Sequence, residues 1–509
     1  MESHTGLRNT GYNSTRCRRL PPEIWMIIFS FGAFDQHGTF WSIYDPSTLA
    51  SLCRSCTLFR DLATPMLYRN FDSRVFTDQW HYFSVAKFTR TICTIPRLAS
   101  FVRKVNIQGA CDMFGQTQVK CLNDPKHPMA SILISKAAEL NMELKYFKEY
   151  TDRNGWKIGF DLVALVLAYL PLIDTLNLDW FDTSIIDVMP RPQSGWPWRH
   201  TRKENLKLCL RAARFAALFE IRNMWLKPCS HVEPPYRHLV PSPSARYTLS
   251  RVLPLLESAE GLTRLSIFGS TGTPMASPFE NLHEATLCRC EFAARDLRKL
   301  LKRCTRLRKF VYMPAPVGWK SAPGAKARDV IEALEPARST LEVLGIDFRL
   351  LIGPRGRRIS SLQSFPALKT LYVDLACVWD WEAGAVTRSS PRPDELFTSL
   401  LPESIQTVAL FGTNPDAEVF GFELEAHVKR LASDIWERGR FQQLRLLRPQ
   451  GFWPFGYGQN ENPQLDDACV RRIATLDGAN IILSDSGVEL ICDEESDSDL
   501  QFQNIMWLL

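Results

Sequence analysis

The segment that decides how the N-terminal part of this chain folds reads Leu20-Pro21-Pro22-Glu23-Ile24-Trp25-Met26-Ile27-Ile28-Phe29. Proline suits the first turn of a helix, where the backbone N–H has no intrahelical acceptor, and an acidic residue there complements the helix dipole. Apolar residues at 24, 27, 28 and 31 then repeat with the spacing of one helix face. The segment therefore predicts an amphipathic helix that begins at its prolines.

A second helix is predicted to start at Ser47 or Thr48, either of which can cap it. Its apolar positions keep helical spacing at Leu49, Leu52, Cys53, Cys56, Phe59 and Leu62. Pro65 then opens a short third helix with Met66 and Leu67. Because so small a unit cannot bury all these side chains internally, we expect it to expose an apolar patch for a partner.

These residues resemble the F-box, a helical module that docks a substrate receptor onto the Skp adaptor of a cullin-RING ubiquitin ligase. The resemblance covers residues 20–71 and rests on Leu20-Pro21-x-Glu23-Ile24, Ile27 and Ile28, Leu52-Cys53-x-x-Cys56-x-x-Phe59, and Leu67-Tyr68. It implies an adaptor-binding surface made of Leu20, Pro21, Glu23, Ile24, Ile27, Ile28, Leu52, Cys53, Phe59 and Leu67. A helical unit with no adaptor partner is the alternative.

Residues 32–46 depart from the F-box pattern, because the family usually has only a short turn there. Loop insertions cost little entropy, so the helices can still pack around this one.

Composition places the chain among ordinary soluble proteins, with 509 residues of which 45% are apolar and 23% charged. The N-terminus lacks the charged and apolar regions of a signal peptide. The longest apolar run, Leu162 to Leu170, falls well short of the ~20 residues that span a bilayer. We therefore expect a cytoplasmic or nuclear protein without membrane contact.

The fourteen cysteines are scattered, mostly at apolar positions of helix or strand patterns, such as Cys56, Cys209 and Cys304. In a reducing compartment such residues are expected to be small buried hydrophobes and not disulfides. The Cys53-x-x-Cys56 and Cys288-x-Cys290 pairs have no second pair at zinc-ligand spacing. No zinc or RING site is therefore expected.

The formal charge of +6 is unevenly distributed. No Lys or Arg follows Arg472, whereas eight acidic residues do, so residues 1–472 carry 61 basic and 47 acidic residues, a net +14. A basic body with an acidic tail favours an acidic partner or simply keeps the protein soluble.

The rest of the chain repeats an apolar-x-x-apolar-x-apolar strand pattern. It begins at Val102, Ile173, Leu262, Leu282, Leu307, Leu341, Leu368, Ile405 and Phe441. From Leu262 onward the starts lie 20, 25, 34, 27, 37 and 36 residues apart. Helices are predicted between these strands, at 161–169, 248–259, 293–303, 327–334 and 417–438.

Strand, turn, helix and strand at this period resemble the leucine-rich repeat, which stacks parallel strands on a concave face and helices on a convex face. The Asn or Cys that the family places in the turn after the strand appears only once, as Cys290. Because this ladder is missing and the periods are uneven, we expect an irregular horseshoe.

The expected fold class is α/β, with an N-terminal all-helical F-box followed by an irregular leucine-rich-repeat solenoid. The expected domains are a disordered basic lead-in at 1–19, the F-box at 20–71, a linker helix at 72–96 and the repeats at 97–448. A Pro- and Trp-rich interruption at 181–247, with a helix at 204–221, separates the early repeats from the later ones. Residues 449–509 comprise an aromatic loop, a solenoid cap and an acidic C-terminal tail.

Catalytic motifs are absent from the sequence. His283-Glu284 lacks the second zinc ligand of a zinc-protease helix, and 353–358 lacks the Lys-Ser or Lys-Thr of a P-loop. The basic run from Arg298 to Lys309 lies mostly on one predicted helix without aromatic residues on which bases could stack. We therefore expect no enzyme and no cofactor, and a solvated surface in preference to a nucleic-acid site.

An F-box followed by irregular leucine-rich repeats is similar to the large F-box families of filamentous fungi. This implies a non-catalytic substrate receptor of an SCF-type ubiquitin ligase, whose repeats bind an unidentified protein for ubiquitin-dependent degradation. One alternative is a repeat scaffold that binds proteins without a ligase role. The other is a nucleic-acid-associated protein that uses the basic surface.

The substrate is expected to contact strand residues that lie between the apolar ones and therefore point to solvent, together with tryptophans in loops. The candidates are Asp174, Asn177, Arg264, Phe268, Glu342, Asp347, Lys369, Tyr372, Trp379, Trp381 and Trp453. The same alternation predicts that Glu284, Thr286, Arg308, Lys309, Val311 and Asp374 also face solvent.

Overall fold

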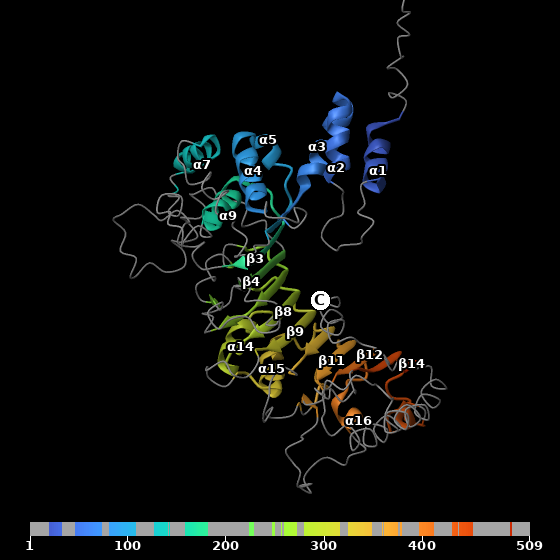
Figure 1. The fold of residues 1–509 in the computed structure, drawn as a ribbon. Coiled ribbons are helices and arrows are strands. Elements are labelled where there is room, and N and C mark those ends of the chain that lie inside the picture. Colours follow the sequence, from blue (N-terminus) through green and yellow to red (C-terminus); the bar gives the residue numbers. More distant parts are fainter. Residues whose placement is uncertain are drawn as a thin grey trace, which may run out of the picture.

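A computed structural model describes residues 20–32, 46–73, 81–107, 127–140, 142, 158–181, 223–228, 247–249, 256, 259–271, 279–315, 324–348, 359, 361–374, 377–378, 396–411, 430–435, 437–450 and 489–490. The described elements are helices and parallel strands, so the predicted α/β class is confirmed (Figure 1). None of the helices in these ranges is long and apolar enough to cross a membrane.

Three helices form an N-terminal unit: α1 (Pro22–Gly32), α2 (Pro46–Ser55) and α3 (Thr57–Arg69). Both α1 and α2 pack against α3. Phe29, Leu49, Ala63 and Met66 are buried at their centre and form a core separate from that of the rest of the chain. Most of the insertion, residues 33–45, lies outside the described residues.

The second predicted helix is in fact two helices, which meet at Cys56. The backbone of Cys56 is extended, and its Sγ accepts a hydrogen bond from the N–H of Phe59 at 3.4 Å. Cys56 therefore caps α3 and is exposed, so the prediction that it is a buried hydrophobe was wrong. Pro65 lies inside α3, which runs on to Arg69, so the short separate helix predicted there was also wrong.

Within the described residues, twelve parallel strands form one sheet, and their order in space follows their order in the chain. They are β1 (Asn70–Asp72), β2 (Lys104–Ile107), β3 (Thr175–Phe181), β4 (Asn223–Pro228), β6 (Arg264–Phe268), β8 (Glu284–Cys290), β9 (Lys309–Pro314), β10 (Val343–Ile346), β11 (Thr370–Asp374), β12 (Thr407–Phe411), β13 (Leu446–Gln450) and β14 (Glu489–Leu490). A second pair, β5 (Tyr247–Thr248) and β7 (Ser270–Thr271), is also parallel. The strands of the large sheet follow one another along an arc (Figure 1).

The same backbone contact starts most of these strands. The contact is made by the residue that directly follows the first apolar residue of the strand pattern. Its carbonyl oxygen accepts hydrogen bonds from two successive N–H groups at the start of the next strand, at 2.7 to 3.2 Å. The accepting residues are Arg103, Thr263, His283, Arg308, Glu342, Lys369 and Gln406. These strands therefore enter the sheet in the same register, although the lengths of the connecting segments differ.

This register corrects the last predicted strand. Arg445 and Leu446 donate to the carbonyl of Gln406, and Leu446 pairs with Thr407. The strand pattern therefore begins at Leu444, three residues after Phe441, where we had placed it. Phe441 instead precedes the strand, with a buried ring and a φ of 52°.

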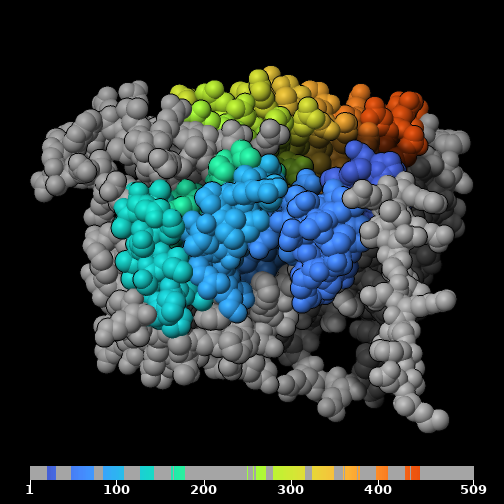
Figure 2. Space-filling model, turned by 90° about the horizontal axis from the view of Figure 1, so that it is seen from above, coloured from blue at the N-terminus to red at the C-terminus, as the bar shows by residue number. Residues whose placement is uncertain are grey.

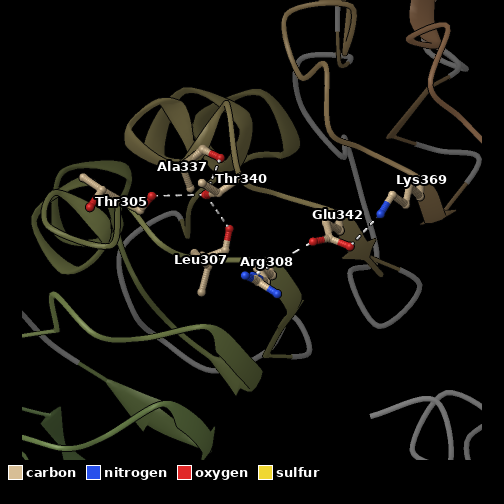
Figure 3. A network of polar contacts seen from close by, with 7 residues as sticks. All are labelled: Thr305, Leu307, Arg308, Ala337, Thr340, Glu342 and Lys369. Atoms are coloured by element: carbon tan, nitrogen blue, oxygen red, sulfur yellow. Dashed lines mark hydrogen bonds and ion pairs between the residues drawn. The ribbon is translucent and has the colours of Figure 1, made fainter.

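A hydroxyl group reinforces the turn that precedes β10. The Thr340 Oγ1 lies 2.9 Å from the carbonyl oxygen of Leu307, 3.1 Å from that of Thr305 and 3.2 Å from that of Ala337 (Figure 3). Ser404 occupies the equivalent place before β12 and donates to the Leu368 carbonyl at 2.8 Å. Side-chain hydroxyls thus bond the segment that precedes one strand to the turn that precedes the next strand.

Replacing Thr340 by valine is expected to lower the free energy of unfolding by about 1–2 kcal/mol, because the hydroxyl is lost while the shape of the side chain is kept. Chemical denaturation measures the change. The matched control is Thr91→Val, since the exposed Thr91 hydroxyl donates only to Lys87 within its own helix and its loss should cost less than about 0.5 kcal/mol. Equal losses in the two variants would show that the contact with Leu307 contributes nothing.

Helices cover one face of the sheet. Near its start these are α4 (His81–Thr94), α5 (Pro96–Ala99), α7 (Pro128–Glu139) and α9 (Ile158–Tyr169), and further along α14 (Ala294–Leu301), α15 (Ala327–Ala333), the 3-10 helix η5 (Glu335–Ala337) and α16 (Leu396–Leu400). In Figure 1, α14, α15 and α16 lie on the outer side of the arc. The apolar strand residues and these helices share one core that extends from Phe71 to Leu447. The helices predicted at 161–169, 293–303 and 327–334 are confirmed as α9, α14 and α15.

The N-terminal unit joins the sheet without an intervening linker. Helix α3 ends at Arg69 and β1 begins at Asn70, while the Arg69 carbonyl accepts a hydrogen bond from the N–H of Arg103 at 2.8 Å. The ring of Phe71 stacks on that of Phe88 in α4, with centroids 3.9 Å apart. The sheet therefore starts well before residue 97, and α4 packs in its core. Figure 2 shows α1–α3 beside α4 and α5 at one end of the molecule.

Candidate interaction surfaces

The outer face of α1 carries a cluster of exposed apolar side chains, which we call the α1 patch. Its members are Leu20, Ile24, Met26, Ile27 and Ile28, each 40–50% exposed. Only two other large apolar side chains in the described ranges are comparably exposed, those of Ile95 and Leu172. Exposed apolar surface concentrated in this way is characteristic of a protein interaction site.

The opposite face of α1 explains why these side chains point outward. Trp25 and Phe29, four residues apart, both make edge-to-face contacts with Phe59 of α3, with centroids 4.8 and 5.2 Å away. These contacts fix the rotation of α1 about its axis. Ile24, Ile27 and Ile28 therefore face away from the small core.

The predicted adaptor-binding residues fall into two groups. Leu20, Pro21, Glu23, Ile24, Ile27 and Ile28 are exposed. The other four, Leu52, Cys53, Phe59 and Leu67, are half-buried and pack against the small core. Met26 belongs to the α1 patch although it was not among the predicted residues. Its position in an unbroken apolar run was the signal that could have identified it.

Several strand residues that we expected to face solvent are buried. These are Asn177, Phe268, Thr286, Val311, Asp347 and Asp374. The crowding along one row of paired residues shows the reason: a Cβ on Gly345 would lie only 3.2 Å from Cγ2 of Val311 on the next strand. Alternation along a strand predicts which face a side chain lies on, but neighbouring strands decide whether solvent reaches it.

The other predicted substrate-binding residues differ in exposure. Asp174 and Tyr372 are half-buried, and Asp174 Oδ1 accepts a hydrogen bond from Thr175 Oγ1 at 2.8 Å. Arg264, Glu342 and Lys369 form ion pairs on the surface. Trp379, Trp381 and Trp453 lie outside the described residues.

Six charged side chains from two adjacent register positions lie at the edge where the strands begin, and we call this set the charged strip. Its members are Arg264, Glu284, Arg308, Lys309, Glu342 and Lys369. Arg264 pairs with Glu284 at 3.1 Å. Glu342 lies between Lys369, at 3.0 Å, and Arg308, at 4.0 Å (Figure 3). Four cations and two anions leave the strip with a net charge of +2.

Lys309 is the most enclosed cation of the charged strip. Burial lowers the pKa of its amine, Glu284 opposes that change, and Arg264 adds to it. Glu284 therefore interacts with a cation on each side, as Glu342 does. Ion pairs this exposed each contribute only about 0–1 kcal/mol to stability, so the strip is not needed to hold the fold together.

The cysteines of the described ranges form no disulfide. Burial raises the pKa of Cys93, Cys290 and Cys304 to about 12 in each case, so these thiols stay protonated at neutral pH. Over the same ranges, no group of three or more His, Cys, Asp or Glu side chains is arranged to hold a metal ion.

No family model and no curated protein matches the chain.

Proposed function

We propose that this chain is the substrate-recognition subunit of an SCF-type cullin-RING ubiquitin ligase. In this proposal residues 20–71 are an F-box that binds the Skp adaptor, and the sheet and its helices form a leucine-rich-repeat solenoid that binds the protein to be ubiquitinated. The chain itself is non-catalytic and acts in the cytoplasm or the nucleus. The α1 patch is the observation that carries the proposal.

The α1 patch supports an adaptor-binding role because of where its residues lie. They coincide with the part of the sequence that resembles the F-box, and they occupy the face of α1 that the small core leaves uncovered. Association with a partner would remove this apolar surface from water, which is the dominant favourable contribution to most protein interfaces.

The sheet supports the repeat assignment through its connectivity. A stack of equivalent units produces parallel strands that follow chain order. Most of these strands also begin at the same kind of doubly accepting carbonyl. The side-chain hydroxyls of Thr340 and Ser404 bond successive units through the turns that precede the strands. In such a stack the exposed edge where the strands begin, with Arg264, Glu342 and Lys369, is available for a protein ligand.

The join between α3 and β1 also fits a receptor. A ligase must hold its substrate within reach of the transferring enzyme, and fixed geometry makes that transfer efficient. Because α3 passes directly into a strand of the sheet, the proposed adaptor-binding and substrate-binding parts cannot swing independently.

Purified full-length chain mixed with the Skp adaptor tests the proposal. We expect a stable complex on size-exclusion chromatography and a dissociation constant in the micromolar range or below by calorimetry. If no complex forms at tens of micromolar, the ligase assignment fails and the alternative of a repeat scaffold without a ligase role replaces it.

A further inference from the structure

The charged strip places charges of opposite sign on successive strands. Arg264 lies on β6, Glu284 on β8, Arg308 and Lys309 at the start of β9, Glu342 before β10 and Lys369 before β11. Beyond these, Gln406 takes the next position and Arg445 the one after it, each donating its N–H to the carbonyl of the equivalent residue on the preceding strand. Cations therefore recur on every second strand.

The spacing of these cations follows from the sheet. Neighbouring strands are about 4.8 Å apart, so cations on every second strand are separated by about 9.6 Å. A peptide in the extended polyproline II conformation advances about 3.1 Å per residue with three residues per turn, which brings every third side chain to the same side at about 9.3 Å intervals. The two periods match closely over the length of the strip.

The strip favours a negatively charged ligand, because its cations outnumber its anions and its arginines are also more exposed than its glutamates. The Arg264 and Arg308 side chains are 63% and 66% exposed, whereas those of Glu284 and Glu342 are 34% and 35% exposed. The glutamates are thus less exposed than the arginines with which they pair, so the cations present more charge to solvent. Asp347 and Asp374 are buried at the opposite ends of their strands, about 13 Å or more along the chain from the strip.

We propose that the charged strip binds an extended acidic segment of the protein substrate, with Asp or Glu at every third position. This inference rests on the proposed receptor function and specifies the chemistry that the receptor selects. Each acidic side chain of the segment would meet one cation of the strip, and the small or neutral residues between them would pass over the glutamates. Binding of this kind weakens as salt is added, because exposed charges are screened.

Fluorescence anisotropy of the full chain with labelled peptides tests the spacing. One ten-residue probe carries aspartate at positions 1, 4, 7 and 10 with alanine and proline between, and the other has the same composition with its four aspartates adjacent. We expect the spaced probe to bind at least fivefold more tightly at physiological salt. Equal affinities would overturn the proposal, since they would indicate only a general attraction to negative charge.

Charge reversal tests the site. Lys369→Glu is expected to weaken binding of the spaced probe about tenfold or more, and a probe with lysine in place of one aspartate should recover part of the loss. The matched control is Arg328→Glu, which makes the same charge change at a similarly exposed cation on α15. An equal effect of the control would overturn the proposal.

Two further outcomes separate this proposal from its alternatives. A peptide of residues 491–500, which carries five acidic residues, serves as a third probe. If it binds the strip more tightly than the spaced probe and displaces it, the chain's own acidic tail is the occupant and the substrate assignment is overturned. Adaptor binding should be unchanged in Lys369→Glu, so loss of peptide binding alone leaves the ligase proposal intact.

Discussion

Replacing Ile27 by aspartate is expected to weaken binding of the Skp adaptor at least 100-fold without lowering the stability of the free chain. The side chain is 50% exposed, so the substitution removes little from the small core. In a complex, however, aspartate would replace apolar contact with a carboxylate that loses its water. Burial of an unpaired charge costs several kcal/mol, and a 100-fold change in affinity corresponds to only about 2.7 kcal/mol.

The matched control for this variant is Ile95→Asp. Ile95 is 48% exposed and lies between α4 and α5, away from the α1 patch. It should leave both the dissociation constant and the unfolding midpoint unchanged within error. Calorimetry gives the first quantity and thermal denaturation the second. Unaltered adaptor binding by Ile27→Asp would rule out the α1 patch as the docking surface, whatever the chain binds elsewhere.

Replacing Asp434 by alanine is expected to lower the free energy of unfolding by about 3 kcal/mol. This carboxylate is fully buried, and three guanidinium groups surround it: Arg438 at 3.3 Å, Arg430 at 3.6 Å and Arg440 at 3.6 Å. Removing one partner of a buried ion pair typically costs about 3–5 kcal/mol, and the three arginines here are partly solvated, which favours the lower end.

Arg440 links Asp434 to helix α16 as well as to Phe441. Its guanidinium donates to the Thr398 carbonyl at 3.1 Å and lies 4.7 Å from the centroid of the Phe441 ring. Urea denaturation measures the loss, and Glu332→Ala, which breaks an exposed pair with Arg328, is the control with an expected cost below about 1 kcal/mol. If Asp434→Ala proved no more costly than that control, the cluster would be structurally neutral.

The strand pattern predicted much of the sheet because its apolar positions face a continuous core. It was wrong at Phe441 because Phe441-x-x-Leu444-x-Leu446 fits the pattern fully, whereas the true strand matches it only at Leu444 and Leu447, with Pro449 third. Backbone pairing with β12 decides between them. Strand β4 was missed although Ile221-x-x-Met224-x-Leu226 fits the pattern, because we assigned its first residue to a predicted helix. At β1 the pattern breaks at Ser73, where an apolar residue would complete it.

The candidate surfaces were less predictable than the fold. The apolar run of α1 indicated its exposed side chains, because their helical spacing is visible in the sequence. The sequence did not indicate the burial of Phe268 and Asp347, since that burial depends on which residues of neighbouring strands lie beside them. The alternation of the charged strip likewise appears only when residues 20 to 40 positions apart are brought side by side by the sheet.

The direct passage from α3 to β1 restricts how this protein can change length. One residue added between Arg69 and Asn70 would turn the N-terminal helices by about 100° relative to the sheet, or else slip β1 so that its inward and outward side chains exchange places. Either result would aim the α1 patch in a new direction. At this junction the chain can therefore vary in composition but not in residue count, whereas the connections between strands already differ in length.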